Sequence, residues 1–251
     1  MLANKRHGYI LNLIKEKGAV TVSELSEKMN VSVETVRRDL LVLEKENALT
    51  RVHGGAVSIG EMISYHSLSA RKEENVEEKI ELSTVAAKLV DDGDIIYVDS
   101  GTTPIHFARA IKDKKVTVIT CSIEVFNELK GGSVKVILCG GEYSAEVASF
   151  CGPLALNTLS KLCIGKAFIF PSAISLRHGV CDFSSADYPA QVEAISKAEK
   201  VYVLASSNKF EKNGLLKLCD VQAEHVYVTD SKIKKEILNA YRENGLKIIS
   251  E

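Results

Sequence analysis

The segment SVETVRRDL at residues 32–40 combines hydroxyl and guanidinium side chains at helical spacing. At about 100° per residue, one side of such a helix is apolar and is expected to face a core; this side carries Val33, Val36, Leu40 and Leu43. The opposite side is polar and carries Glu34, Thr35, Arg38 and Lys45, with Arg37 on the flank. Arginine can contact guanine edges and threonine can bind a base or a phosphate, so this face suits a DNA major groove. The alternative is a solvated helix face with an ion pair inside the RRD triplet.

Two helix starts precede this face. Thr21 followed by Glu24 is a capping box, and Ser32 with Glu34 in the next turn is a second N-cap signal. The sequence therefore predicts helices over residues 6–17, 21–29 and 32–47. Because only two residues separate the second and third helices, the pair is typical of a helix-turn-helix, whose second helix enters the DNA major groove.

A short basic segment, ALTRVHGGAV at residues 48–57, follows these helices. Its glycine pair permits a tight turn. We interpret it as a small hairpin, or wing, in which Arg51, His53 and Gly54 contact DNA phosphates or the minor groove. His53 could equally be an ordinary turn residue.

A second polar cluster stands at the end of an apolar run, in DIIYVDSGTTP at residues 94–104. A strand, a glycine-containing turn with hydroxyl side chains and a helix N-terminus together form an anion-binding site, and phosphate is the ligand expected there. The residues of this turn are Asp99, Ser100, Gly101, Thr102 and Thr103. Alternatively, Thr103 only caps the helix that follows and Gly101 only makes the turn.

Two further apolar runs also end in polar or glycine residues. The candidate residues there are Thr120, Cys121, Ser122, Gly140 and Gly141. Ligands of an open α/β sheet lie beyond the carboxyl ends of its strands, so the three loops are expected to face one crevice. The two glycines could instead serve close packing alone.

Apolar β-branched runs alternate with amphipathic stretches from about residue 94 onward, which predicts a parallel sheet covered on both faces, an α/β fold. Strands are expected at 94–98, 116–120, 134–138, 167–170, 201–205, 226–229 and 246–249. Helices are expected at 75–89, 104–111, 123–129, 153–159, 187–198 and 231–244. The chain thus divides into a small helix-turn-helix domain (1–57), a linker (58–74) and a larger Rossmann-like domain (75–251).

Composition is that of a folded globular protein, with 251 residues, 45% hydrophobic and 26% charged. The net charge of −1 hides an uneven distribution, because residues 1–57 hold nine Lys/Arg and seven Asp/Glu. The six cysteines form no CxxC pair, so we expect reduced core residues and no metal site. The longest stretch without a charged residue is shorter than a membrane span, and the amino-terminal residues do not resemble a signal peptide, so we expect a cytoplasmic protein.

The small domain resembles the DNA-binding domain of the DeoR family of bacterial transcriptional regulators. The resemblance lies in Arg6, Ile10 and Ile14, in SVETVRRDL at 32–40 and in RVHGGA at 51–56. It implies a winged helix-turn-helix with Ser32, Thr35, Arg37 and Arg38 on double-stranded operator DNA.

The larger domain is similar to the effector domain of the same family, through VDSGTT, the GGE loop, Gly152, Gly179 and SNKF at 207–210. This implies a sugar-phosphate isomerase-like fold and a phosphorylated sugar or related metabolite as ligand. The resemblance also implies that Asp99, Ser100, Gly101, Thr102 and Thr103 form the phosphate end of the site, with Lys209 near it. The sequence departs from the family at Cys121, at Ser206–Phe210, where an acidic residue is absent, and at Pro189.

The leading hypothesis is a repressor of a sugar operon whose operator binding responds to the metabolite, acting as a homodimer or homotetramer because one helix-turn-helix reads half a site. No cofactor is expected. One alternative is a sugar-phosphate isomerase or deaminase that uses Asp99 as its base. Another is a regulator whose larger domain only oligomerises.

Overall fold

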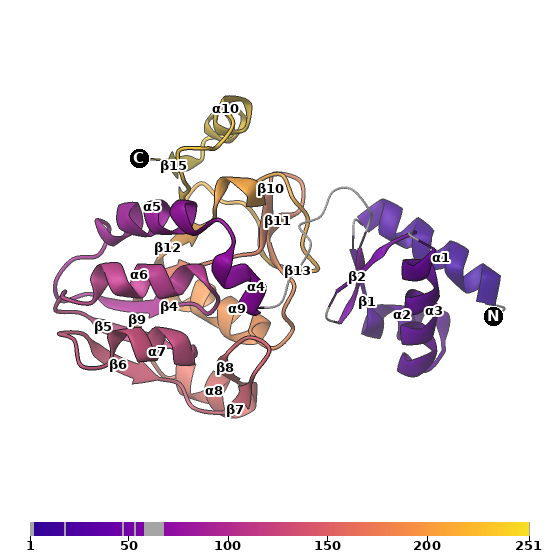
Figure 1. The fold of residues 1–251 in the computed structure, drawn as a ribbon, viewed down its shortest axis with the longest axis horizontal. Coiled ribbons are helices and arrows are strands. Elements are labelled where there is room, and N and C mark those ends of the chain that lie inside the picture. Colours follow the sequence, from indigo (N-terminus) through magenta and orange to yellow (C-terminus); the bar gives the residue numbers. More distant parts are fainter. Residues whose placement is uncertain (1–2, 18, 47, 53, 58–67, 251) are drawn as a thin grey trace.

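The computed structural model describes residues 3–17, 19–46, 48–52, 54–57 and 68–250, which form a small amino-terminal domain and a larger α/β domain (Figure 1). The small domain contains three helices and three short strands. These are α1 (Ala3–Lys17), β1 (Ala19–Thr21), α2 (Val22–Met29), α3 (Val33–Lys45), β2 (Thr50–Val52) and β3 (Gly55–Val57).

Helices α2 and α3 begin at the residues that the capping signals indicate. The Thr21 hydroxyl accepts a hydrogen bond from the Glu24 amide at 3.1 Å, and the Ser32 hydroxyl accepts one from the Thr35 amide at 3.2 Å. Between the helices, Asn30 adopts the left-handed conformation with φ of 51°, which asparagine tolerates better than most residues. The short turn places α3 against α2, and the helix-turn-helix prediction is confirmed.

Strands β2 and β3 form the predicted hairpin, and β1 pairs with β3 to complete a three-stranded antiparallel sheet. Glycine is required at each of the two positions of the turn, for a different reason at each. Gly54 has φ of +85°, whereas a Cβ at Gly55 would lie 2.0 Å from the Val20 carbonyl oxygen. The small domain is thus a winged helix-turn-helix; His53 lies outside the described residues.

The segment expected to be a linker, 58–74, contains a helix, α4 (Leu68–Glu73). Residues 58–67 lie outside the described part of the chain. A helix of six residues is too short to show the periodicity that identifies longer ones, which explains why the sequence pattern missed it. Helix α5 (Val76–Ala87) follows, near the predicted position.

All seven predicted strands are present and pair in parallel in a single seven-stranded sheet. They are β4 (Ile95–Val98), β5 (Thr117–Thr120), β6 (Lys135–Leu138), β9 (Ile164–Ile169), β12 (Ala198–Leu204), β14 (Val226–Val228) and β15 (Lys247–Ile249). The spatial order is β15-β14-β12-β9-β4-β5-β6. Strands β5 and β6 lie on one side of β4, and the later strands, from β9 to β15, lie on its other side. The strand order therefore changes direction between β4 and β9, and this position is the reversal point of the sheet.

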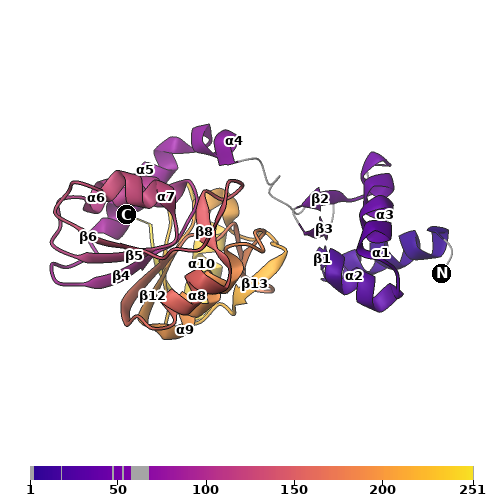
Figure 2. The same ribbon diagram turned by 90° about the horizontal axis from the view of Figure 1, so that it is seen from below.

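Helices cover both faces of this sheet, as Figures 1 and 2 show. One face packs against α5, α6 (Thr103–Ile111) and α7 (Ile123–Leu129). The other packs against α8 (Gly152–Leu159), α9 (Tyr188–Lys197) and α10 (Lys235–Glu243). Each face has its own apolar cluster, and the small domain has a third. The α/β prediction is confirmed; α10 begins four residues later than expected.

Several short elements beyond the sheet were not predicted. They are β7 (Glu142–Ser144), β8 (Ser149–Cys151), β10 (Ala173–Ser175), β11 (Gly179–Asp182), β13 (Leu216–Cys219) and a 3-10 turn, η1 (Ser207–Lys209). Strands β7 and β8 form a hairpin, and β10, β11 and β13 form a small antiparallel sheet beside the ligand pocket described below.

The cysteines are all free, but only Cys121, Cys139 and Cys181 are buried. Cys163 is exposed, so the expectation of core cysteines is wrong there. Across the described residues, no helix combines the length and apolar character needed to cross a bilayer.

Candidate DNA interface and ligand pocket

The exposed face of α3 carries the polar side chains that its helical spacing predicts. Arg37 and Arg38 are exposed, as are Ser32 and Glu34, and Thr35 is half-buried. Val36, Leu40 and Leu43 are buried in the core. Val33 was expected to be buried with them but is 41% exposed and is absent from the apolar cluster of the small domain.

The ion pair proposed within the RRD triplet does not form. Asp39 is instead buried and accepts hydrogen bonds from Arg6 Nε at 2.6 Å and Arg6 Nη2 at 2.9 Å, with His7 Nε2 at 3.2 Å. Burial alone would raise the pKa of Asp39, but its hydrogen bonds with Arg6 and His7 hold that pKa below its usual value. The carboxylate thus joins α1 to α3 and leaves both neighbouring arginines on the surface.

The exposed arginines differ in their neighbours. Arg37 lies 3.8 Å from a Glu34 carboxylate oxygen one turn earlier. Arg51, on the wing, lies 3.6 Å from Glu44, which also accepts the Arg51 amide and so joins the wing to α3. Arg38 makes no ion pair with any described residue. Its guanidinium is therefore the one on α3 most readily offered to a phosphate or base.

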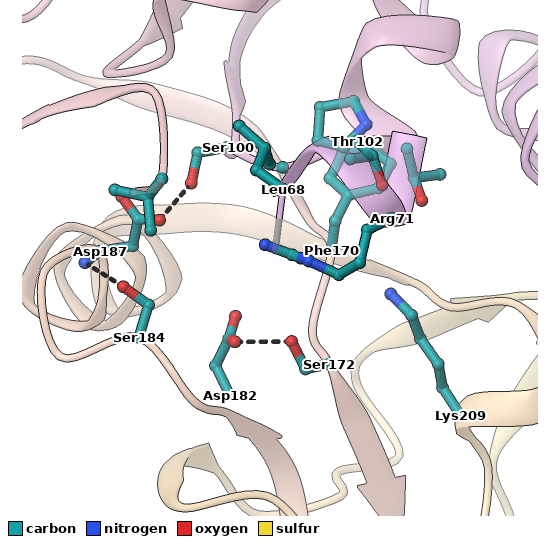
Figure 3. Close-up of a pocket in the computed structure, with 14 residues that line it drawn as sticks. Leu68, Arg71, Ser100, Thr102, Phe170, Ser172, Asp182, Ser184, Asp187 and Lys209 are labelled. Atoms are coloured by element: carbon teal, nitrogen blue, oxygen red, sulfur yellow. Dashed lines mark hydrogen bonds between the residues drawn. The ribbon is translucent and has the colours of Figure 1, made fainter. Parts of the chain in front are cut away.

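A polar pocket lies at the carboxyl ends of β4 and β9, where the sheet connections diverge. This is where an open α/β sheet leaves a crevice. Its lining comes from several separate parts of the chain and is drawn in Figure 3. The lining residues are Leu68, Arg71, Ser100, Gly101, Thr102, Thr103, Pro104, Val147, Phe170, Ser172, Asp182, Ser184, Asp187 and Lys209.

The predicted anion loop forms one wall of the pocket. Gly101 has φ of +120°, a conformation that side chains rarely allow, and α6 begins at Thr103 with Pro104 in its first turn. Thr102 is the N-cap residue, but its hydroxyl makes no capping hydrogen bond. The loop therefore brings a helix N-terminus without a side-chain cap, together with threonine hydroxyls, to the pocket, which favours a negatively charged group.

Asp99 lies behind this loop, outside the lining. Its carboxylate accepts hydrogen bonds from the amides of Ser100 at 2.8 Å and Phe170 at 3.1 Å and from Gln191 Nε2 at 3.0 Å. Gln191 also donates to Asp182 at 2.8 Å, so one amide joins both acids. Burial raises the pKa of Asp99 to about 6. Asp99 thus positions the loop from within the core.

Two further acids face the pocket. Asp182 accepts hydrogen bonds from the Ser172 hydroxyl and the Phe183 amide, both at 2.7 Å. Asp187 accepts the Ser100 hydroxyl at 2.7 Å (Figure 3). Burial raises the pKa of Asp187 to about 7, and the charge of Asp99 adds to this effect. These carboxylates supply acceptors for hydroxyl groups of a ligand.

Lys209 and Arg71 bring positive charge to the same space. Lys209 donates to the Pro171 carbonyl oxygen at 2.8 Å, and burial lowers its pKa to about 8. Arg71 extends across the pocket between Ser100 and Lys209 (Figure 3). The pocket therefore pairs an anion-binding wall with a wall of carboxylates and serines.

The residues predicted at the other two strand ends lie outside this lining. Thr120, Cys121 and Ser122 are buried; Thr120 accepts the Ser122 amide at 3.0 Å, and the Ser122 hydroxyl caps α7. A Cβ on Gly140 would meet no other atom within 4 Å, whereas a Cβ on Gly141 would lie 2.4 Å from the Cys151 carbonyl oxygen. Because β5 and β6 lie on one side of the reversal point, their loops end away from the crevice.

Sequence reasoning missed Arg71, Ser172, Asp182, Ser184, Asp187 and Gln191. Most of them stand on short elements without periodicity. One signal was available: Asp187 stands two residues before Pro189, at the start of a predicted helix, where an acidic residue is favoured.

A winged helix-turn-helix joined to an α/β domain with a polar pocket defines a DNA-binding regulator with a ligand-sensing domain. The chain belongs to the DeoR family, since residues 6–62 match the model of the DeoR-like helix-turn-helix domain and residues 74–231 match that of the DeoR C terminal sensor domain. The protein is thus a DNA-binding transcriptional regulator.

Relatives match over almost the whole chain. An uncharacterized HTH-type transcriptional regulator, YulB of Bacillus subtilis, is 32% identical over 99% of this chain and 96% of its own length. The lactose phosphotransferase system repressor of Lactococcus lactis is 29% identical over 97% of both chains. The L-fucose operon activator of Haemophilus influenzae is 32% identical over 92% of this chain and 93% of its own.

Proposed function

We propose that the protein represses a carbohydrate operon and that a phosphorylated sugar or related metabolite bound in the α/β pocket changes its affinity for operator DNA. The observation that carries the DNA assignment is the exposed α3 face, where Arg37 and Arg38 stand clear of the Asp39–Arg6 pair. The relatives named for lactose and fucose systems support a carbohydrate role.

The residues proposed to contact DNA are those of α3 and its surroundings. They are Thr21, Ser32, Glu34, Thr35, Arg37, Arg38, Arg51, His53 and Gly54. Arg38 and Arg51 are expected to bind phosphates or base edges, whereas the Glu34 carboxylate holds Arg37 in the free protein.

The chemistry of the pocket supports a phosphorylated polyol as the ligand. Hydroxyls and a helix N-terminus gather with Lys209 at one wall, which suits a phosphate. Asp182 and Asp187 provide acceptors for hydroxyls at the other.

The pocket is proposed to bind its ligand without catalysis. Asp99, the base considered for an isomerase, has three hydrogen-bond donors on its carboxylate and lies outside the pocket lining. A general base must reach the proton it removes.

One helix-turn-helix reads half a site, so we also propose a homodimer or homotetramer, located in the cytoplasm where bacterial operators are. The ligand needs only to bind one arrangement of the assembly better than the other to change DNA affinity.

Gel retardation tests the whole proposal. The full-length protein is incubated with the DNA fragment upstream of its own gene, with and without each of a panel of sugar phosphates. A retarded band that one sugar phosphate weakens supports the proposal. Retardation unaffected by the panel would leave the sensor function unsupported and favour a domain that only oligomerises.

A further inference from the structure

A cleft lies between the winged domain and the α/β domain, and residues proposed to contact DNA line it. Figures 1 and 2 both show β13 beside the three-stranded sheet of the winged domain. The residues of the proposed DNA contact that line the cleft are Thr21, Arg37, Arg51 and Gly54. The α/β domain contributes Ser185, Leu215 and Leu216. The DNA-binding face, meaning the exposed surface of α3 and the wing, is therefore turned in part toward the other domain.

The side chain of Leu215 lies against the glycine pair of the wing. A Cβ added to Gly55 would lie 3.0 Å from Leu215 Cδ1, and one added to Gly54 would lie 3.9 Å from Cδ2. The absence of side chains at the two glycines therefore allows the leucine to approach the backbone of the wing. Because Leu215 is already within van der Waals distance of this backbone, a DNA phosphate has no room at the same place.

Apolar side chains of both domains face this cleft. Val33 is 41% exposed, and Val22 and Val52 are half-buried. All three line the cleft together with Leu215 and Leu216, which are also half-buried. Apolar groups that face one another across a narrow space lose less free energy to hydration than the same groups in open water. The cleft thus explains why Val33, on the apolar side of α3, does not join the core of its own domain.

The segment that carries Leu215 is held firmly within the α/β domain. The Leu215 amide donates to the Asp182 carbonyl oxygen at 2.9 Å, and Leu216 pairs with Asp182 between the antiparallel strands β13 and β11. At Gly214, an added Cβ would lie 2.5 Å from the Cys181 Cβ, so this residue packs directly on β11. Leu215 is therefore presented to the wing from a fixed position on a sheet.

We propose that Leu215 and Leu216 dock on the wing and the first turn of α3, and that this contact competes with operator DNA for the DNA-binding face. The protein then has a docked form, in which the α/β domain covers part of this face, and an undocked form that binds DNA. The apparent DNA affinity is the intrinsic affinity multiplied by the undocked fraction. The inference rests on the proposed assignment of Arg37, Arg51 and Gly54 to DNA.

Gel retardation of the upstream DNA fragment by full-length Leu215→Ser is the first test. The substitution removes the apolar contact with the wing and adds no charge. We expect the affinity for DNA to rise at least about threefold, because a larger fraction of the protein is undocked. Circular dichroism checks that the variant is folded.

Leu176→Ser is the matched control. Leu176 follows β10 at the edge of the same small antiparallel sheet and is 37% exposed, but it does not line the cleft. Its substitution should leave DNA affinity unchanged. Equal affinity in Leu215→Ser and wild type overturns the docking proposal while the DNA role of α3 stands. If neither protein retards the fragment, the DNA assignment of this face fails, and the inference fails with it.

Hydroxyl-radical footprinting of the wild-type protein needs no variant to fold. Mass spectrometry measures the oxidation rate of Leu215 with and without saturating DNA fragment. We expect DNA to raise this rate at least about twofold, because DNA binding selects the undocked form and frees the leucine side chain. The rate at Leu176 should not change. An unchanged or lower rate at Leu215 would show that the contact persists on DNA and would overturn the proposed competition.

Discussion

The guanidinium of Arg6 donates to both carboxylate oxygens of Asp39, with Nε 2.6 Å from Oδ2 and Nη2 2.9 Å from Oδ1. The two residues lie 33 positions apart, so the contact binds α1 to α3 rather than linking neighbours within α3. It is a structural pair beneath the DNA-binding face. The adjacent arginines remain available because this acid is already occupied.

Removal of this pair should loosen the winged domain. Asp39→Ala removes the buried carboxylate that accepts both of these Arg6 hydrogen bonds, and we expect a loss of about 2–3 kcal/mol in the free energy of unfolding of that domain. Hydrogen exchange at α1 and α3 measures it. Glu34→Ala, which breaks an exposed pair, should cost less than about 0.5 kcal/mol. Equal effects would show that the Asp39 contact contributes little.

DNA binding should depend on the exposed arginines of α3. Arg38→Ala is expected to weaken binding to the upstream fragment and to lower the slope of log affinity against log salt by about one if it contacts a phosphate. Arg242→Ala, on the exposed side of α10, is the control and should change neither quantity. Retardation that survives Arg37→Ala and Arg38→Ala together would exclude α3 as the recognition helix.

Replacement of Gly101 should weaken ligand binding in addition to lowering the stability of the fold. Gly101 and Gly93 both have positive φ, +120° and +93°, so alanine at either should destabilise the fold by about 1–2 kcal/mol. Only Gly101→Ala should also weaken phosphate binding, since Gly93 is remote from the pocket lining. Thermal shifts with and without phosphate distinguish the two variants.

The buried acids should make stability fall as pH rises. Burial raises the pKa of Asp187 to about 7 and that of Asp99 to about 6, so the fold favours their protonated forms. Their stabilising contribution is complete below about pH 4, the ordinary range for aspartate, and is lost as pH approaches 7. Asp187→Asn keeps an acceptor for Ser100 and should flatten the fall in Tm between pH 5 and 8. An unchanged profile would mean that Asp187 does not titrate in this range.

The seven strands could be predicted because each is a nearly continuous apolar run, as burial on both faces requires. The capping residues Thr21 and Ser32 could be predicted because their partners lie three positions away. Such signals are local. The order of the strands in the sheet depends on contacts between distant parts of the chain. This order decides which loops lie together.

The pocket shows this limit. Ser100–Thr103 were identified from one strand end, but the loops after β5 and β6 were placed beside them although the crevice lies between β4 and β9. Asp182 and Asp187 reach the pocket from a separate antiparallel sheet and the loop beyond it. Arg71 reaches it from a helix too short to give a periodic signal. Contacts over such separations leave no pattern in the sequence.

The three apolar clusters share no residue, and the cluster of the winged domain is built only from residues before position 57. A core mutation in one domain therefore lowers the stability of that domain and leaves the apolar core of the other unchanged. Changes that adapt the pocket to a new metabolite need not disturb the helix that reads the operator, and changes in that helix need not disturb the pocket. Ligand preference and operator preference can in this way diverge separately during evolution, provided that the short connection between the domains is preserved.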